Sequence, residues 1–237
     1  DIYINDAFSC SHREQTSIHK ITRYVKDCYA GPLLMKEVTS IDMVLNAKKK
    51  PITCIIGGSK ISTKIGLIIS LMKKVNNLII VGAMANNFIK FKGNKVGKSL
   101  IEEGSEKKIK EIYDKAINFG CKIFIPSDVA VSGNIQGKAN FKDLDKIEGS
   151  ERILDVGPKT IKNINEIIDT SKTVLWNGPA GYFENKEFAI GTISIAKKIA
   201  YNTSNASLIS IVGGGDTVSA IKNNVLNLNF THLSTAG

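Results

Sequence analysis

The chain has 237 residues, of which 43% are hydrophobic and 23% charged, as is typical of a soluble globular protein with a substantial core. Its longest apolar runs, such as Ile65 to Met72, are far shorter than the roughly 20 residues that cross a bilayer, which excludes a membrane-spanning helix. The net charge of +10 invites a nucleic-acid interpretation, but the lysines are scattered and no aromatic platform is interleaved with them. We therefore expect neither a membrane nor a nucleic acid as a partner.

The first 32 residues do not join the pattern of the rest of the chain. They open with DIYIND, which is neither a start methionine nor a signal peptide, and we expect upstream sequence to be missing. We interpret residues 1–32 as the remnant of an amino-terminal domain. This range ends in a Gly31-Pro32 break. Residues 33–46, helical in pattern from Leu33 to Leu45, are predicted to connect this remnant to a domain over residues 47–237.

Residues 47–237 alternate short β-branched runs with longer stretches of helical periodicity. This alternation predicts an α/β domain of three layers, with a parallel sheet covered by helices on both faces. The predicted strands are Thr53–Ile56, Leu78–Val81, Lys122–Ile125, Thr173–Trp176 and Leu208–Val212. The predicted helices are Ile61–Lys74, Met84–Phe91, Ile101–Asn118, Thr160–Asp169, Lys186–Tyr201 and Thr217–Asn223.

In such sheets the ligand crevice lies at the carboxyl ends of the strands, so the residues after each strand are candidates for function. Here they are rich in glycine, proline and short polar side chains. They read Gly57-Gly58-Ser59-Lys60, Gly82-Ala83-Met84, Pro126-Ser127-Asp128, Asn177-Gly178-Pro179 and Gly213-Gly214-Gly215-Asp216-Thr217.

The stretch IVGGGDTVSA runs from a buried strand through three glycines into a helix that starts with Asp216 and Thr217. Glycines let backbone N–H groups approach phosphate oxygens, the helix start adds positive potential, and an Asp there can hold Mg²⁺. The same residues fit an ordinary tight turn with Asp216 as a helix cap. This stretch alone does not separate the two interpretations.

The stretch CIIGGSKISTK repeats this pattern and adds Lys60 and Lys64, whose spacing of four places both on one face of a predicted helix. Two close ammonium groups repel unless an anion lies between them, which favours a phosphate clamp over two solvated surface lysines. Neither loop is a Walker A or a G-x-G-x-x-G motif, which argues against P-loop proteins and dinucleotide-binding dehydrogenases.

A third turn lies in VLWNGPAGYFE, where Asn177, Gly178 and Pro179 follow a strand and precede Glu184. A proline and aromatic-edged turn can form a wall for adenine, and a carboxylate can accept hydrogen bonds from ribose hydroxyls. Taken singly, the stretch is also compatible with a simple turn.

Four cysteines are widely spaced and have neither C-x-x-C spacing nor a histidine partner. We expect Cys10, Cys28, Cys54 and Cys121 to be reduced core residues of a cytoplasmic protein.

Together these loops resemble the phosphoglycerate kinase family from Asn5 almost to the last residue. The matching motifs keep their order along the chain. They are NDAF (Asn5–Phe8), HR (His12, Arg13), GGSKISTKI (Gly57–Ile65), LIIVGAMA, EEG (Glu102–Gly104), PSDV (Pro126–Val129), DVGPKT (Asp155–Thr160), WNGP, GYFE, GGGDT and HLSTAG.

The resemblance implies reversible transfer of the acyl phosphate of 1,3-bisphosphoglycerate to MgADP, a glycolytic reaction that gives 3-phosphoglycerate and MgATP. The implied catalytic residues are Lys60, Gly214 and Gly237, with Lys60 stabilising the moving phosphoryl group. Arg13 matches an arginine that grips the phosphoglycerate, and Asp216 matches the magnesium ligand. The residues implied to bind the nucleotide are Lys64, Asn177, Pro179, Glu184, Gly213, Gly214, Gly215, Asp216 and Thr217.

The resemblance makes residues 47–237 the Rossmann-like, carboxy-terminal nucleotide-binding domain of a monomer, with Mg²⁺ as cofactor and ATP or ADP as co-substrate. Gln15 departs from the family, which has a second histidine there, and Ala236 replaces the first glycine of an STGG-like loop. Most of the family's basic patch for phosphoglycerate belongs to an amino-terminal domain of which only a strand and Arg13 are present. We therefore expect this chain to bind nucleotide without turnover. A degenerate domain without function is the alternative, although every nucleotide-side residue is intact.

Overall fold

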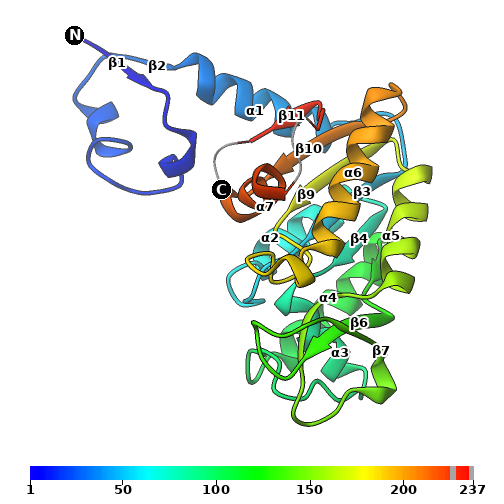
Figure 1. Ribbon diagram of the computed structural model, residues 1–237. Coiled ribbons are helices and arrows are strands. Elements are labelled where there is room, and N and C mark those ends of the chain that lie inside the picture. Colours follow the sequence, from blue (N-terminus) through cyan, green and yellow to red (C-terminus); the bar gives the residue numbers. More distant parts are fainter. Residues whose placement is uncertain (225–227, 235–237) are drawn as a thin grey trace.

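The protein is described by a computed structural model that covers residues 1–224 and 228–234 (Figure 1). Its centre is a sheet of parallel strands in the order β11-β10-β9-β3-β4-β5. The chain builds outward from β3 to β5 and then returns to place β9 on the other side of β3, which puts a topological switch point between β3 and β9. The strands are β3 (Ile52–Ile56), β4 (Asn77–Ile80), β5 (Lys122–Phe124), β9 (Thr173–Asn177), β10 (Ile209–Gly213) and β11 (His232–Leu233).

Helices cover both faces of this sheet, which confirms the predicted three-layer α/β fold. Because side chains alternate along a strand, Cys54 and Ile56 of β3 pack into one core and Ile55 into the other. The first core is completed by α1 (Pro32–Leu45), α2 (Ile65–Met72), α3 (Ala83–Phe91) and α4 (Glu106–Phe119). The second is completed by α5 (Pro158–Thr170), α6 (Ile190–Ser204) and α7 (Gly215–Asn224).

A second sheet, which the sequence pattern did not predict, lies between β5 and α5 in the chain. Its antiparallel strands run in the order β7-β6-β8, from β6 (Asp128–Ser132), β7 (Asn140–Asp143) and β8 (Arg152–Val156). The sequence gives β7 no apolar run because its residues, NFKD, are mostly polar and none of them is buried. This sheet lies at the end of the molecule opposite β1 and β2 (Figure 1).

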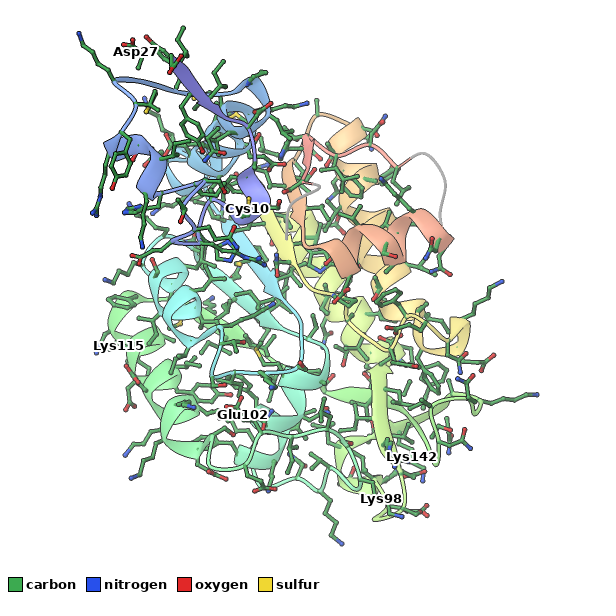
Figure 2. The ribbon with its side chains drawn as sticks, turned by 90° about the vertical axis from the view of Figure 1, so that its left-hand side faces the viewer. Cys10, Asp27, Lys98, Glu102, Lys115 and Lys142 are labelled. Atoms are coloured by element: carbon green, nitrogen blue, oxygen red, sulfur yellow. The ribbon has the colours of Figure 1, made fainter. Side chains whose placement is uncertain are left out.

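The amino-terminal segment stands apart from the main body at the far end of α1 (Figure 1). It holds the parallel pair β1 (Ile2–Asn5) and β2 (Asp27–Ala30), and no residue from 1 to 30 is buried. Figure 2 shows Cys10 and Asp27 in this segment, far from Lys98 and Lys142 at the other end. Two contacts anchor α1. Asp6 Oδ1 accepts a hydrogen bond from Leu34 N (2.8 Å), and Glu37 Oε2 lies 2.8 Å from Nε2 of His232 in β11.

Three sequence-based expectations need correction. The helix predicted from Ile101 begins at Glu106, because the preceding residues form a loop that includes Gly104 at φ +70°. The helix predicted from Ile61 begins at Ile65, so Lys60 and Lys64 do not share a helix face. Cys54 and Cys121 are buried in the core as expected, but Cys10 and Cys28 are not, since they belong to the unburied amino-terminal segment.

Over the described ranges, no helix is long and apolar enough to cross a membrane.

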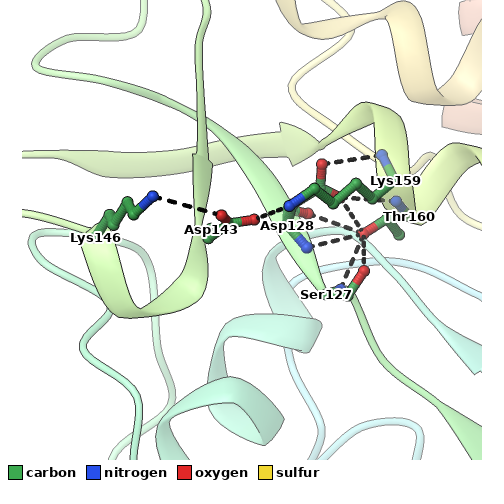
Figure 3. A network of polar contacts seen from close by, with 6 residues as sticks. All are labelled: Ser127, Asp128, Asp143, Lys146, Lys159 and Thr160. Atoms are coloured by element: carbon green, nitrogen blue, oxygen red, sulfur yellow. Dashed lines mark hydrogen bonds and ion pairs between the residues drawn. The ribbon is translucent and has the colours of Figure 1, made fainter.

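The buried carboxylate of Asp128 connects the antiparallel sheet to the start of α5 (Figure 3). Asp128, at the start of β6, is 3% exposed and accepts hydrogen bonds from the backbone N–H groups of Lys159 (2.9 Å) and Thr160 (2.7 Å). Thr160 Oγ1 returns a third bond to Asp128 Oδ1 (2.7 Å). These are the N–H groups that a helix leaves without intrahelical partners, so Asp128 caps α5 from a distant strand.

We expect Asp128→Ala to lower the free energy of unfolding by about 2 kcal/mol, because it leaves the amides of Lys159 and Thr160 without their acceptor, while the Thr160 hydroxyl keeps the main-chain carbonyl of residue 128. Urea denaturation measures the change. Lys159→Ala is the matched control, since it removes only the exposed ion pair between Lys159 and Asp143 and should leave the midpoint almost unchanged. Equal losses in the two variants would contradict the assignment.

Candidate functional site

A cavity of about 460 Å³ lies at the carboxyl ends of the parallel strands, a size typical of small-molecule sites. Turns that follow β3, β4 and β9 form one side of it, through Gly58, Gly82 and Pro179. Asp216 lines it from the start of α7, and the antiparallel sheet closes it on the opposite side. One concave site therefore collects loops that are widely separated in the sequence.

The turns after β3 and β9 cross in direct backbone contact. Gly57 N donates a hydrogen bond to Asn177 O (2.8 Å). A Cβ atom on Gly57 would lie less than 3.0 Å from the backbone of Gly178 and Pro179, and one on Gly178 would equally meet the backbone of Gly57. Gly178 also has φ +97°, a conformation that L side chains rarely adopt. Glycine is therefore required at both positions, because only glycine lets the two turns approach closely enough to line one site.

Lys64 spans this crossing. Its Nζ donates hydrogen bonds to Gly57 O (2.8 Å) and to Asn177 Oδ1 (3.1 Å). Burial lowers the pKa of Lys64, while the negative charge of Asp216 acts in the opposite direction. The ammonium group is thus a partly desolvated cation that has neutral oxygens as its hydrogen-bond partners, and it lies within electrostatic reach of the start of α7.

Among the described residues, the start of α7 supplies backbone N–H groups that have no intrahelical partner. Val218 N donates to Gly214 O (3.0 Å), so the amides of Gly215, Asp216 and Thr217 come before the first intrahelical bond. Gly215 has open space where a Cβ would be. Thr217 is fully buried, and its Oγ1 accepts a hydrogen bond from Gly178 N (2.8 Å), which ties this helix to the turn after β9.

The opposite end of the cavity is largely apolar. Ile89, Leu100, Val129 and Ile153 line it together with the basic residues Lys98 and Arg152, and Asn86 of α3 lines the cavity as well. Glu184, which is exposed, lies on the rim formed by the segment from 179 to 184. The cavity therefore combines an end rich in glycine amides with an apolar end, which suits a ligand with an anionic and a flat apolar part.

Glu102 fixes the loop that carries Lys60. Glu102 Oε2 accepts a hydrogen bond from Ser62 N (3.0 Å), and Lys108 lies 3.5 Å from its Oε1 atom. The hydrogen bonds from Ser62 lower the pKa of Glu102 to about 2, so its carboxylate is ionised at neutral pH. Figure 2 shows Glu102 on the main body of the protein.

Asp155 lines the cavity from β8 and is almost completely buried. Its Oδ2 accepts a hydrogen bond from Gly191 N and its Oδ1 from Val156 N, both at 2.8 Å. Burial raises the pKa of Asp155 to about 7, although the two amides act against the rise. Its neighbour Leu154 accepts a hydrogen bond from Tyr182 N (2.7 Å), so this strand positions the segment that ends in Glu184.

The residues predicted from the sequence are only partly brought together. Pro179, Glu184 and Asp216 line the cavity, and Lys64, Asn177 and Thr217 form hydrogen bonds that join its loops. Gly213 and Gly214 lead into the start of α7.

Other predicted residues lie elsewhere. Lys60 is exposed in the loop before α2 and is not among the residues that line the cavity. Arg13 is exposed in the amino-terminal segment. Gly237, like Ala236, lies outside the described residues.

Several cavity residues were not predicted. Asn86 had a signal, since the pair Asn86-Asn87 interrupts the apolar pattern of a predicted helix. Asp155 opens the DVGPKT motif, but neither it nor Leu154 was predicted to line a cavity, because β8 itself was not predicted.

A family model described as phosphoglycerate kinase matches residues 1–237. The phosphoglycerate kinase of Wolbachia pipientis wMel is 44% identical over the whole chain, and that of Zymomonas mobilis 39% identical. The solved structure of phosphoglycerate kinase from Coxiella burnetii matches all of the chain with a TM-score of 0.91 and 38% identity, and that from Pyrococcus horikoshii matches with 0.84 and 29%. The chain spans about 60% of the length of the curated relatives it matches.

We expect the difference in unfolding free energy between the wild type and Asp155→Asn to depend on pH. The folded state raises the pKa of Asp155 to about 7 from an unfolded value near 4, so the folded state holds the proton more tightly. The stability gained from that proton is full below about pH 4 and is lost as the pH rises to about 7, a change of roughly 4 kcal/mol. Asparagine does not titrate. Urea denaturation of both proteins between pH 4.5 and 8 measures the difference, and a constant value would show that the pKa of Asp155 is ordinary.

Proposed function

Because the chain belongs to the phosphoglycerate kinase family, we propose that it binds MgADP or MgATP and supplies the nucleotide side of a reversible phosphoryl transfer. In this reaction the acyl phosphate of 1,3-bisphosphoglycerate passes to ADP, giving 3-phosphoglycerate and ATP. The observation that carries the proposal is the convergence of the glycine turns after β3, β4 and β9 and the start of α7 on one cavity. Exposed backbone amides and one half-buried lysine at such a convergence suit a polyphosphate.

The polar end of the cavity is proposed to hold the phosphates. The amides of Gly215, Asp216 and Thr217 point out of the start of α7, where the helix dipole favours negative charge. Gly213 and Gly214 let a phosphate approach the backbone. Lys64 is already partly stripped of water, so a phosphate oxygen could replace Gly57 O or Asn177 Oδ1 as its partner at modest cost.

The other end is proposed to hold the nucleoside. Pro179 and the apolar wall offer a flat surface for the base, while Asn177 keeps the turn that carries Pro179 in place. Glu184 lies on the rim, where a carboxylate can accept hydrogen bonds from the ribose hydroxyls.

Asp216 is proposed as the Mg²⁺ ligand. Over the described ranges, no group of three or more His, Cys, Asp or Glu side chains could hold a metal ion by itself. A single exposed carboxylate beside a phosphate site fits Mg²⁺, which usually keeps several waters and takes its remaining ligands from substrate phosphates. When bound, the ion would neutralise charge on the phosphates.

The transfer itself breaks one P–O bond of the acyl phosphate and forms another to an oxygen of the β-phosphate of ADP, so no nucleophilic side chain is required. The protein has to align the two reactants and neutralise the charge that spreads over the moving group. We assign that neutralisation to Lys60, with Gly214 and Gly237 as the other catalytic residues and Arg13 as a ligand of the phosphoglycerate. Lys60 and Arg13 are exposed and are not among the residues lining the cavity, so closure around both substrates must bring them in.

Within this proposal, residues 1–32 belong to the acid-binding side, residues 33–46 connect the two sides, and residues 47–237 bind the nucleotide. We also propose a cytoplasmic monomer, in keeping with the glycolytic role of the family. The chain spans 60% of its relatives, and we assign most contacts to the acid to the part that it does not span. The 237-residue chain should then bind nucleotide without phosphoglycerate-dependent consumption of ATP.

Calorimetric titration of this chain tests nucleotide binding and the role of Asp216 together. The wild type should bind MgADP, and Asp216→Asn should weaken MgADP binding roughly 10-fold or more while changing metal-free ADP little, because the lost partner is the cation. Absence of MgADP binding by the folded wild type would refute the proposed function. Equal losses with and without Mg²⁺ would reduce Asp216 to a helix cap.

Lys60→Ala should lower kcat by roughly 100-fold with little change in nucleotide affinity, because its charge is assigned to the transition state. Turnover is measured in a chimeric protein in which this chain is joined to the part of the Wolbachia pipientis phosphoglycerate kinase that it does not cover. The control is Lys115→Ala, on the outer side of α4 (Figure 2), which should keep the wild-type kcat and nucleotide affinity. A matching loss of affinity and rate in Lys60→Ala would assign Lys60 to ground-state binding.

A further inference from the structure

The apolar end of the cavity contains one buried polar group that lacks a partner. Asn86, near the start of α3, is 0% exposed and lines the cavity. Its Nδ2 donates a hydrogen bond to Leu100 O (3.0 Å). Its Oδ1 is also buried, and in the part of the chain that the structure describes it accepts no hydrogen bond. Such a group is costly, and most buried side-chain acceptors in proteins are satisfied.

The orientation of this amide follows from chemistry. The carbonyl of Leu100 can only accept a hydrogen bond, so the NH₂ group of Asn86 has to face it. Turning the amide over would place two acceptors against each other and would leave the NH₂ group without this bond. The Leu100 carbonyl therefore fixes Oδ1 as the atom without a partner among the described residues, so the unsatisfied group that Asn86 holds in the cavity wall is an acceptor and not a donor.

The position of Asn86 relates it to the base of a nucleotide. Its neighbours in the wall include the apolar Ile89, Leu100 and Ile153. Two cations also line the cavity: Lys98, which is exposed, and Arg152, whose Nη1 atom donates a hydrogen bond to Gly133 O (2.8 Å). The glycine amides at the start of α7 follow β10, and α3 follows β4, three strands away in the sheet order. At about 4.8 Å per strand, the two ends stand roughly 14 Å apart. A ligand whose phosphates lie at α7 would thus bring its base toward Asn86.

We propose that Asn86 is a specificity-determining residue that accepts a hydrogen bond from the exocyclic amino group of adenine. The inference rests on the proposed function, since it takes the ligand to be a nucleoside diphosphate or triphosphate. Adenine carries an NH₂ donor at position 6, where hypoxanthine and guanine carry a carbonyl acceptor. A purine with that carbonyl sets an acceptor against Oδ1 and leaves both unsatisfied, whereas adenine pairs with it.

Inosine diphosphate is the matching probe, because it differs from ADP at the position in question and keeps the ribose and phosphates. Calorimetry on the 237-residue chain, in the presence of Mg²⁺, gives the ratio of the two affinities. We expect the wild type to bind ADP about 10-fold more tightly than inosine diphosphate. In Asn86→Leu, which is similar in size and has no acceptor, the ratio should fall to nearly one, mainly through loss of ADP affinity.

The neighbouring asparagine supplies a control. Asn87 is also buried, but its Oδ1 accepts hydrogen bonds from Glu102 N (2.8 Å) and Ser105 Oγ (3.2 Å), and it is not among the residues that line the cavity. Asn87→Ala should perturb α3 and yet keep the wild-type ratio. Asn86→Ala replaces Asn86→Leu if circular dichroism shows that the leucine variant does not fold.

The outcomes separate this inference from the proposed function. Failure of the folded wild type to bind either nucleotide would refute the proposed function. Binding of both with equal affinity, or equal losses for both in Asn86→Leu, would leave nucleotide binding intact and overturn the role of Asn86.

Discussion

The site depends on one close approach, that of the turns after β3 and β9 at the switch point of the sheet. Their backbones touch at Gly57 and Gly178, where any side chain would overlap the opposite loop. Lys64 adds hydrogen bonds to both turns, and Thr217 brings the start of α7 to the same place. The two strands stay paired to their ends, and the chain then leaves β3 toward α2 on one face of the sheet and β9 toward α6 on the other, which opens a concave space between the two loops.

Acidic side chains accept hydrogen bonds from backbone N–H groups at several places in the structure. Asp6, Glu102, Asp128 and Asp155 each accept hydrogen bonds from backbone N–H groups of another segment. A carboxylate can satisfy several amides at once, which suits N–H groups in loops and in the first turns of helices, where no ladder or intrahelical partner is available. The free-energy cost of keeping the carboxylate charged differs between them. Glu102 is partly solvated and its pKa is lowered, whereas burial raises the pKa of Asp155 and disfavours its charged form.

The cavity has a part lined by glycine turns and a more apolar part, because its walls come from different elements of the fold. The parallel sheet contributes glycine turns and a helix start, whose free amides attract anions. The antiparallel sheet and α3 contribute the apolar side chains of Val129, Ile153 and Ile89, beside the basic Arg152 of β8. The proposed phosphoryl transfer would use both, since such a reaction proceeds by alignment and charge neutralisation and an apolar end would fix where the phosphates of a bound nucleotide lie.

The sequence by itself determined the parallel sheet, the helices on its two faces and the turns that carry Gly57, Gly178 and Asp216, because hydrophobic period and glycine placement are local properties. Ordered motifs also identified the family. Only the tertiary structure decided that Lys64 bridges two turns, that Lys60 lies off the helix, and that Asp155 and Asn86 stand in the cavity wall. These features depend on contacts between residues far apart in the chain, such as the bond from Asn86 to Leu100, and no local pattern encodes them.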